Sequence, residues 1–256
     1  MSRPDTVPAD IAGALGRAGT RLGLFGARLL WYDEIGSTND TASRLADAGA
    51  AAGTVVAANA QTSGRGRLGR TWVSPPGAGL YFSVVLRPEM HVVPMLTLAA
   101  GVAVADGIEA ATGLTTTLKW PNDVQAGGRK LAGILAEGGA FVIVGIGINV
   151  RAAAYPPDIA TRATSLEQEL GRDVDRGLVL AECLAALNAR SAELYAAGGA
   201  SAIVAAWKRR AAPMWGRAVE WDSGRGVAEG VASDGALLVR TARGVERILS
   251  GEVRWT

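Results

Sequence analysis

The chain has 256 residues, 49% of them hydrophobic, with 26 basic and 24 acidic side chains and a formal net charge of +2. This length suits one large domain, or one large and one small domain, and the near balance of charge is no argument by itself for a nucleic-acid partner. The single cysteine, Cys183, excludes an intrachain disulfide, and with the single histidine, His91, it cannot supply a Cys/His zinc site.

The sequence carries no obvious targeting or membrane signal. The first thirty residues lack the continuous apolar core of a secretory signal, and no uninterrupted apolar run approaches the length of about 20 residues that spans a bilayer. We therefore expect a cytoplasmic protein with no membrane partner.

In chain order, residues 1–28 are expected to be a tail with at most one short helix. A strand at 29–32 precedes a helix that begins at Ser37 or Thr38 and ends near Ala48. Further strands are expected at 54–59, 80–86, 115–120, 124–125, 130–137 and 141–150, and helices at 94–112, 165–170 and between Asp175 and Arg210. The almost wholly apolar segment 141–150 predicts a central strand covered on both faces.

After Pro213 the pattern changes to five short strands, at 218–221, 226–233, 236–241, 245–250 and 253–255. Short strands with glycine or aspartate turns predict a small β-barrel. We therefore expect an α+β protein, in which a mixed or antiparallel sheet packs with helices over residues 29–212 and a small barrel occupies residues 213–256.

Residues 61–72, here called the arginine loop, carry three glycines and three arginines: Gly64, Arg65, Gly66, Arg67, Gly69 and Arg70. Glycine lets backbone N–H groups approach an anion closely, and the arginine fork binds anions in two places at once. The loop is too polar to bury itself, so we expect it to be mobile and to become ordered on an anion. By itself it also fits a solvated loop or an RNA-binding patch.

A second polar group is Lys119-Trp120-Pro121-Asn122-Asp123, followed seven residues later by Lys130. Lysines for phosphate, an aspartate for metal and an asparagine for orientation would suit a triphosphate nucleotide with Mg²⁺. A plain turn with lysines at the rim explains the segment nearly as well.

The glycines of 145–150 do not make a dinucleotide fingerprint, because Val150 stands where a third glycine is needed and the segment is a strand. They are better explained by close approach of a ligand or another part of the chain, with Asn149 at the end of the strand as a possible site residue.

Five segments appear together in this order: Gly36-Ser37-Thr38-Asn39, the arginine loop, Lys119 to Asp123, Arg129 to Leu135, and Gly145 to Asn149. In this combination the chain resembles the biotin protein ligases over residues 29–255. The resemblance implies a class II synthetase-like catalytic domain with an SH3-like C-terminal barrel. It also implies that biotin and MgATP form biotinyl-adenylate, from which biotin passes to a lysine of a biotin carboxyl carrier domain.

By the same resemblance, Lys130 and Arg67 are the expected catalytic residues. The expected biotin-binding residues are Ser37, Thr38, Asn39, Gln61, Gly64, Arg65, Gly66, Arg67, Lys130 and Gly133. Those expected at ATP or the adenylate are Arg65, Arg67, Arg70, Trp72, Lys119, Asn122 and Asn149, with Asp123 at the metal.

Some family members carry an N-terminal winged helix, and about 28 residues are too few for one, so we expect a ligase of the monofunctional type with no DNA partner. Two alternatives stay open: lipoate–protein ligation, which uses the same adenylation logic, and a nucleic-acid-binding module built from the arginine loop and the C-terminal barrel. Biotin, ATP and RNA binding would separate the three.

Overall fold

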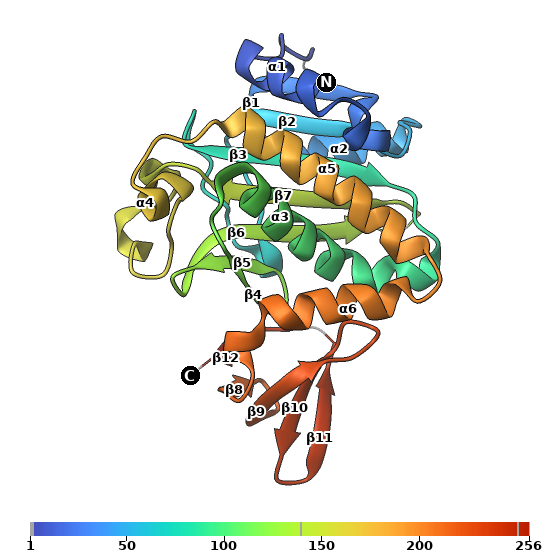
Figure 1. The fold of residues 1–256 in the computed structure, drawn as a ribbon, viewed down its shortest axis with the longest axis vertical. Coiled ribbons are helices and arrows are strands. Elements are labelled where there is room, and N and C mark those ends of the chain that lie inside the picture. The colour runs from blue at the N-terminus through green and yellow to red at the C-terminus, as the bar shows by residue number, and fades with distance from the viewer. Residues whose placement is uncertain (1–2, 139, 250, 256) are drawn as a thin grey trace.

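The computed structural model describes residues 3–138, 140–249 and 251–255. Its main sheet has seven strands in the order β1-β2-β3-β7-β6-β5-β4 (Figure 1). Their bounds are β1 Leu29–Ile35, β2 Val55–Gln61, β3 Gly79–Leu86, β4 Thr117–Lys119, β5 Asp123–Ala126, β6 Arg129–Gly138 and β7 Val142–Asn149. Only β1 and β2 run parallel, so the sheet is mixed, as the sequence predicts.

Two helices, α3 (Leu96–Thr112) and α5 (Arg176–Tyr195), cover one face of this sheet (Figure 1). They form one large apolar core with side chains such as Val144 and Ile148 of β7. On the other face α2 (Thr38–Asp47) covers only part of the sheet, through a smaller cluster that includes Val56 and Ile143. The uncovered remainder of that face is where the cavity described below lies.

The N-terminal segment is more ordered than the expected tail. Helix α1 (Ala9–Ala18) and the 3-10 segment Gly19–Gly26 pack against α5, with Ile11 and Phe25 fully buried. Alanine and glycine dominate this segment, so the sequence pattern does not make its few large apolar anchors obvious. The domain boundaries at residues 29 and 212 stay predictions.

The segment Val92–Thr112, which includes α3, is the one helix in the described part of the chain that is long and apolar enough to cross a membrane by length and composition alone. Asp106 and Glu109 interrupt its apolar run, so the expectation that no uninterrupted apolar run approaches that length is not contradicted. Most of this segment is buried inside the protein, as expected for the central helix of a folded core.

The remaining helices are α4 (Leu166–Leu170) and α6 (Gly199–Arg210), with 3-10 turns at Arg67–Gly69, Met90–Met95, Ala152–Ala154, Pro157–Ile159 and Ala212–Met214. Asp175 caps α5 by accepting a hydrogen bond from Leu178 N at 3.0 Å, as predicted.

Beyond α6 the chain forms a five-stranded antiparallel sheet in the order β11-β10-β9-β8-β12 (Figure 1). Its strands are β8 Ala218–Trp221, β9 Gly224–Val231, β10 Leu237–Thr241, β11 Gly244–Ile248 and β12 Arg254–Trp255. The prediction of five strands here is confirmed; Ser250, expected at the end of one, lies outside the described residues. Trp120 donates a hydrogen bond from Nε1 to Gly235 O at 2.9 Å and so ties the two sheets together.

Candidate functional site

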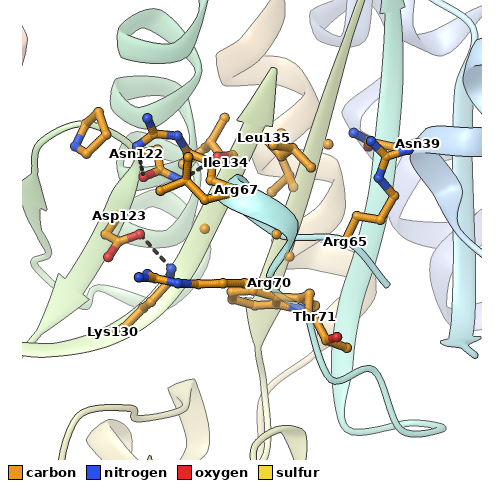
Figure 2. A pocket seen from close by; sticks show the side chains of 18 of the residues that line it. Asn39, Arg65, Arg67, Arg70, Thr71, Asn122, Asp123, Lys130, Ile134 and Leu135 are labelled. Atoms are coloured by element: carbon orange, nitrogen blue, oxygen red, sulfur yellow. Dashed lines mark hydrogen bonds and ion pairs between the residues drawn. The ribbon is translucent and has the colours of Figure 1, made fainter. Parts of the chain in front are cut away.

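A cavity of about 350 Å³ lies between the uncovered face of the main sheet, the arginine loop and the segment before β12. Its wall collects most of the residues that the sequence analysis selected: Ser37, Thr38, Asn39, Gln61, Arg65, Gly66, Arg67, Arg70, Trp72, Lys119, Asn122, Asp123, Lys130 and Gly133. In Figure 2, Asn39 and Arg65 lie on one side of this cavity and Asp123 and Lys130 on the other. The two sides differ in chemistry.

Three glycines on β6 and β7 make the floor flat. A Cβ at Gly145 would lie 2.0 Å from Asn39 Oδ1, and a Cβ at Gly147 would lie 2.4 Å from the Trp72 ring. A Cβ at Gly133, opposite Gly147 in the register, would also meet Trp72, at 2.9 Å. The glycines therefore let the side chains of Asn39 and Trp72 lie directly on the strands. This is the close approach of another part of the chain that the glycine pattern predicts.

The neutral side of the cavity is built at the start of α2. Ser37 caps this helix and is itself buried, as is Thr38. Thr38 donates hydrogen bonds from its N at 2.8 Å and its Oγ1 at 3.1 Å to Gln61 Oε1. Gln61 in turn donates from Nε2 to Ser74 Oγ at 2.8 Å. These side chains hold donors and acceptors in fixed directions without a net charge.

Asn39 completes this side of the cavity. Its Nδ2 donates a hydrogen bond to Glu137 Oε2 at 2.8 Å, and its Oδ1 accepts one from Ser83 Oγ at 2.6 Å. Ser83 lies on β3 directly opposite Gly145 in the sheet register. Asn39 is therefore held at both ends of its amide.

The other side of the cavity is cationic. Lys130 Nζ pairs with Asp123 Oδ1 at 2.7 Å (Figure 2). It also lies 5.3 Å from the centre of the Trp72 ring, within cation–π range. Burial lowers the pKa of Lys119, and Asp123 partly offsets this effect. Lys119 therefore gives up its proton more readily than an exposed lysine does.

Arg67 projects from the arginine loop toward the same side. Its Nη1 donates to Asn122 Oδ1 and its Nη2 to Gly251 O, each at 3.4 Å, while Asn122 Nδ2 donates to Ile134 O at 2.7 Å. Burial is the main cause that lowers the pKa of Arg67, against the opposing effect of Asp123. Long hydrogen bonds to a partly buried guanidinium leave room for a better partner.

The ends of the arginine loop are held by ion pairs. Arg65 contacts Asp40 and Glu137, and Arg70 contacts Glu252 just before β12. Between them Leu68 has a left-handed backbone, with φ 55°, and is 64% exposed. The structure thus shows one arrangement of the loop, and the predicted mobility stays a prediction.

The cavity wall contains five cationic side chains against two carboxylates, Asp123 and Glu252. In the described part of the chain no three His, Cys, Asp or Glu residues group as a metal site. A Mg²⁺ ion held by the protein alone would not fit here, but Mg²⁺ commonly binds through one carboxylate and substrate phosphates. Asp123 fits that second mode.

Comparisons with known proteins agree with this geometry. A sequence profile described as the Biotin/lipoate A/B protein ligase family matches residues 31–149, and one described as the Biotin protein ligase C terminal domain matches residues 222–254. The Bifunctional ligase/repressor BirA of Bacillus spizizenii is 38% identical over 251 residues, covering 93% of this chain and 77% of that protein. The Biotin--[acetyl-CoA-carboxylase] ligase of Paracoccus denitrificans is 38% identical over 85% of this chain and 96% of its own. The chain belongs to the biotin protein ligase family.

The structural comparison supports the same membership. The biotin protein ligase from Aquifex aeolicus, solved in complex with biotin and ATP, superposes with a TM-score of 0.79 at 34% sequence identity. The match covers 90% of this chain and all of the other. The fold class expected from the sequence, a mixed sheet packed with helices and followed by a second all-β unit, is confirmed.

The structure leaves two of the expected site residues off the cavity wall. Gly64 stands at a tight turn of the arginine loop, where a Cβ would lie 2.3 Å from Trp72 O. Asn149 donates from Nδ2 to Thr164 O at 2.9 Å and, more weakly, to Lys130 O at 3.5 Å. In this arrangement each supports a neighbouring site residue, and their direct ligand contacts stay predictions.

Sequence reasoning missed four contributors to the site: Ser83, Glu137, Gly145 as a seat for Asn39, and the wall segment 251–253. A serine within the apolar strand 80–86 was a usable signal, because a buried hydroxyl needs a partner. The segment 251–253 carried no such signal in the sequence, because its position on the cavity wall depends on how the second sheet packs against the main domain.

Proposed function

We propose that this protein joins biotin to a lysine of a biotin carboxyl carrier domain at the expense of ATP, through biotinyl-adenylate. The observation that carries the proposal is the division of one cavity above a flat glycine floor. One side is cationic, and the other is polar without net positive charge, because its one arginine, Arg65, is paired with Asp40 and Glu137. Biotin is a neutral ureido ring joined by an apolar chain to a carboxylate, so its two ends match the two sides.

The ureido ring is assigned to the side formed by Ser37, Thr38, Asn39 and Gln61. Thr38 is hydrogen-bonded to Gln61, Asn39 to Ser83 and Glu137, and Ser37 to Asp40 N. Ser37, Thr38 and Asn39 are also buried, so this side is already oriented before a ligand arrives. A preorganised neutral site loses little entropy on binding. Gly133 and Leu135 on the adjacent strand would face the apolar part of the ligand.

The first chemical step brings two anions together. A carboxylate oxygen of biotin attacks the α-phosphorus of ATP, the bond to the bridging oxygen breaks, and pyrophosphate leaves with its electron pair. Lys130 and Arg67 supply fixed positive charge at the point where the anions meet, which is the main requirement of phosphoryl transfer chemistry. Lys130 would exchange Asp123 for the ligand at this stage.

The nucleotide is assigned to the remaining cationic wall, with Arg70 and Lys119 near phosphate, Asn122 near the base or ribose and Trp72 as an apolar surface. Asp123, freed from Lys130, would hold Mg²⁺ together with the phosphates. Bound there, the ion would neutralise phosphate charge.

In the second step the neutral amine of the carrier lysine attacks the acyl carbon of the adenylate. An amide bond forms, AMP leaves, and one proton is released. The arginine loop would shield the anhydride from water until then. Because the reaction consumes ATP, the cytoplasm is the compartment we expect.

Intact mass spectrometry tests the whole proposal. The protein is incubated with MgATP, biotin and a purified biotin carboxyl carrier domain, with lipoate in place of biotin in a second reaction. We expect the carrier to gain the mass of one biotin and none of lipoate. Modification by lipoate alone would replace the proposal with lipoate ligation, and no modification in either reaction would overturn it.

A further inference from the structure

Glu137 lies just outside the cavity wall, near the end of β6. It follows Gly133 and Leu135 in the two-residue alternation of that strand, so its side chain leaves the sheet on the same face. Gly133 and Leu135 line the cavity, whereas Glu137 lines the adjoining hollow beneath the arginine loop. Its side chain therefore acts on the cavity through the residues that it binds.

The Glu137 carboxylate divides its two oxygens between two donors. Oε2 accepts a hydrogen bond from Asn39 Nδ2 at 2.8 Å, and Oε1 pairs with Arg65 Nη2. An ionised carboxylate only accepts hydrogen bonds, so both neighbours must present N–H groups to it.

Asn39 needs the Glu137 carboxylate because its other neighbour, Ser83, does not determine which end of the amide faces which way. Ser83 Oγ lies 2.6 Å from Asn39 Oδ1, but a hydroxyl donates and accepts equally well, so either end of the amide would suit it. Asn39 is only 5% exposed, so water cannot readily take over this selection. Glu137 alone requires the amide nitrogen on its own side.

The choice is passed on along a short chain of hydroxyls. Ser83 Oγ lies 2.8 Å from Thr38 Oγ1, which in turn lies 3.1 Å from Gln61 Oε1. With the oxygen of Asn39 facing Ser83, the Thr38 proton is used inside the protein, on Ser83 or on Gln61. Both lone pairs of Thr38 Oγ1 are then free for an N–H of the ligand, whereas with the amide reversed Ser83 would donate its proton to Thr38 Oγ1 and occupy one of them.

We infer that Glu137 is a positioning residue for biotin: it sets the direction in which the Asn39 amide, and the hydroxyls beyond it, present donors and acceptors to the ureido ring. This inference rests on the biotin-binding roles proposed above. The same carboxylate also pairs with Arg65, so Glu137 takes part both in orienting the biotin side and, together with Asp40, in anchoring Arg65 of the arginine loop.

The test is Glu137→Gln, measured by biotin-dependent pyrophosphate exchange. Glutamine has one carbonyl oxygen for two donors, so either Asn39 or Arg65 loses its acceptor and the amide of Asn39 is no longer fixed. We expect the KM for biotin to rise roughly tenfold, the typical effect of losing a charge-assisted hydrogen bond. The KM for ATP and the rate at saturating biotin should stay close to those of the wild type, a split that general damage to the fold would not produce.

A second variant keeps the test decisive if Glu137→Gln folds poorly. Ser83→Ala interrupts the chain one residue further on, and we expect the biotin KM to rise in the same direction. Because both residues act on one chain, the double variant should be no worse than the more affected single variant. Additive effects would overturn the inference.

Two controls separate this route from others. Asp40→Asn removes the second carboxylate from Arg65 without touching Asn39, and Glu246→Gln removes an exposed carboxylate on β11. Both should leave the biotin KM near that of the wild type. An equal rise in Asp40→Asn would show that the effect travels through Arg65, and would overturn the inference. A wild-type protein without exchange activity would instead remove the proposed function and this inference with it.

Discussion

The two faces of β7 differ in the size of their side chains: one carries large apolar residues and the other carries glycines. Toward α3 and α5 the strand presents Val144 and Ile148, which are buried in the large apolar core. Toward the cavity it presents Gly145 and Gly147, whose missing side chains are replaced by Asn39 and Trp72 lying flat on the strand. The core face stabilises the fold because large side chains fill the space beneath the helices. The cavity face provides a binding surface because glycines leave space above the strand. We therefore expect substitutions on the cavity face of β7 to change activity and substitutions on its core face to change stability.

The largest effect is expected at the cationic end of the cavity face. Lys130→Ala removes the amine that lies between Asp123 and the Trp72 ring. Loss of a charge that stabilises the reacting anions should lower pyrophosphate exchange by about a thousandfold. Lys208→Ala, on an exposed position of α6, is the matched control, and thermal melting should show both variants folded. Near-normal exchange in Lys130→Ala would refute the assigned role.

A methyl group on the floor should be nearly as damaging. In Gly147→Ala the new Cβ would meet the Trp72 ring at 2.4 Å and push it into the cavity. Since displacements of about 1 Å can cost a hundredfold in rate, we expect a loss of that order in exchange activity. Gly16→Ala in α1, where no atom lies within 4 Å, should leave activity unchanged. Equal activity in both variants would show that the flat floor is dispensable.

Arg67→Gly tests retention of the intermediate. It removes the guanidinium that contacts both Asn122 and Gly251. Without it the arginine loop should close less well, and we expect about tenfold more biotinyl-adenylate in solution, with biotin attached to lysines outside the carrier. Chromatography of the free adenylate and peptide mapping measure the two effects. Arg243→Ala, at an exposed position, is the control. Tight, carrier-specific labelling by Arg67→Gly would contradict the proposed shielding of the adenylate by the arginine loop.

A smaller effect concerns pH. Burial lowers the pKa of Lys119, so raising the pH removes its charge earlier than for an ordinary lysine. The KM for ATP should therefore rise severalfold on the alkaline side. In Lys119→Arg the guanidinium has a much higher pKa than a lysine amine and keeps its charge, so this rise in KM should move to higher pH. If the KM for ATP rises at the same pH in Lys119→Arg as in the wild type, the titrating group is not Lys119.

The smallest effect on activity is expected on the core face. Ile148→Val removes one buried methylene next to α3 and α5, which should cost about 1 kcal/mol of unfolding free energy. Denaturant unfolding should detect this loss while the biotin KM stays the same. A change in KM without loss of stability would erase the distinction between the two faces.

The sequence predicted most of this architecture because its elements are marked locally. The cap at Ser37, the cap at Asp175 and the turn-separated strands after Pro213 are all short-range signals, and each is present in the structure. The motif order also located most of the cavity wall, since those residues lie at the ends of strands and helices whose order the fold brings together.

What the sequence could not give depends on contacts between distant segments. The buried role of residues 9–26 comes from packing on α5, which lies some 160 positions away along the chain. Glu137 reads as an ordinary charge near a turn until Asn39 and Arg65 are seen beside it. Strand β7 is almost wholly buried, as the apolar segment 141–150 predicts, but periodicity could not say that Asn39 and Trp72, rather than a helix, would cover Gly145 and Gly147.

Gly251 and Glu252 have a consequence for affinity. Both residues lie between β11 and β12 of the second sheet. They nevertheless bind Arg67 and Arg70, the two arginines that an anionic ligand would contact. An incoming phosphate therefore competes with these internal acceptors for the two guanidinium groups. Because Gly251 and Glu252 are tethered to the same chain, they are present at a high and constant local concentration, and we expect them to weaken the binding of a singly charged ligand more than that of a multiply charged one.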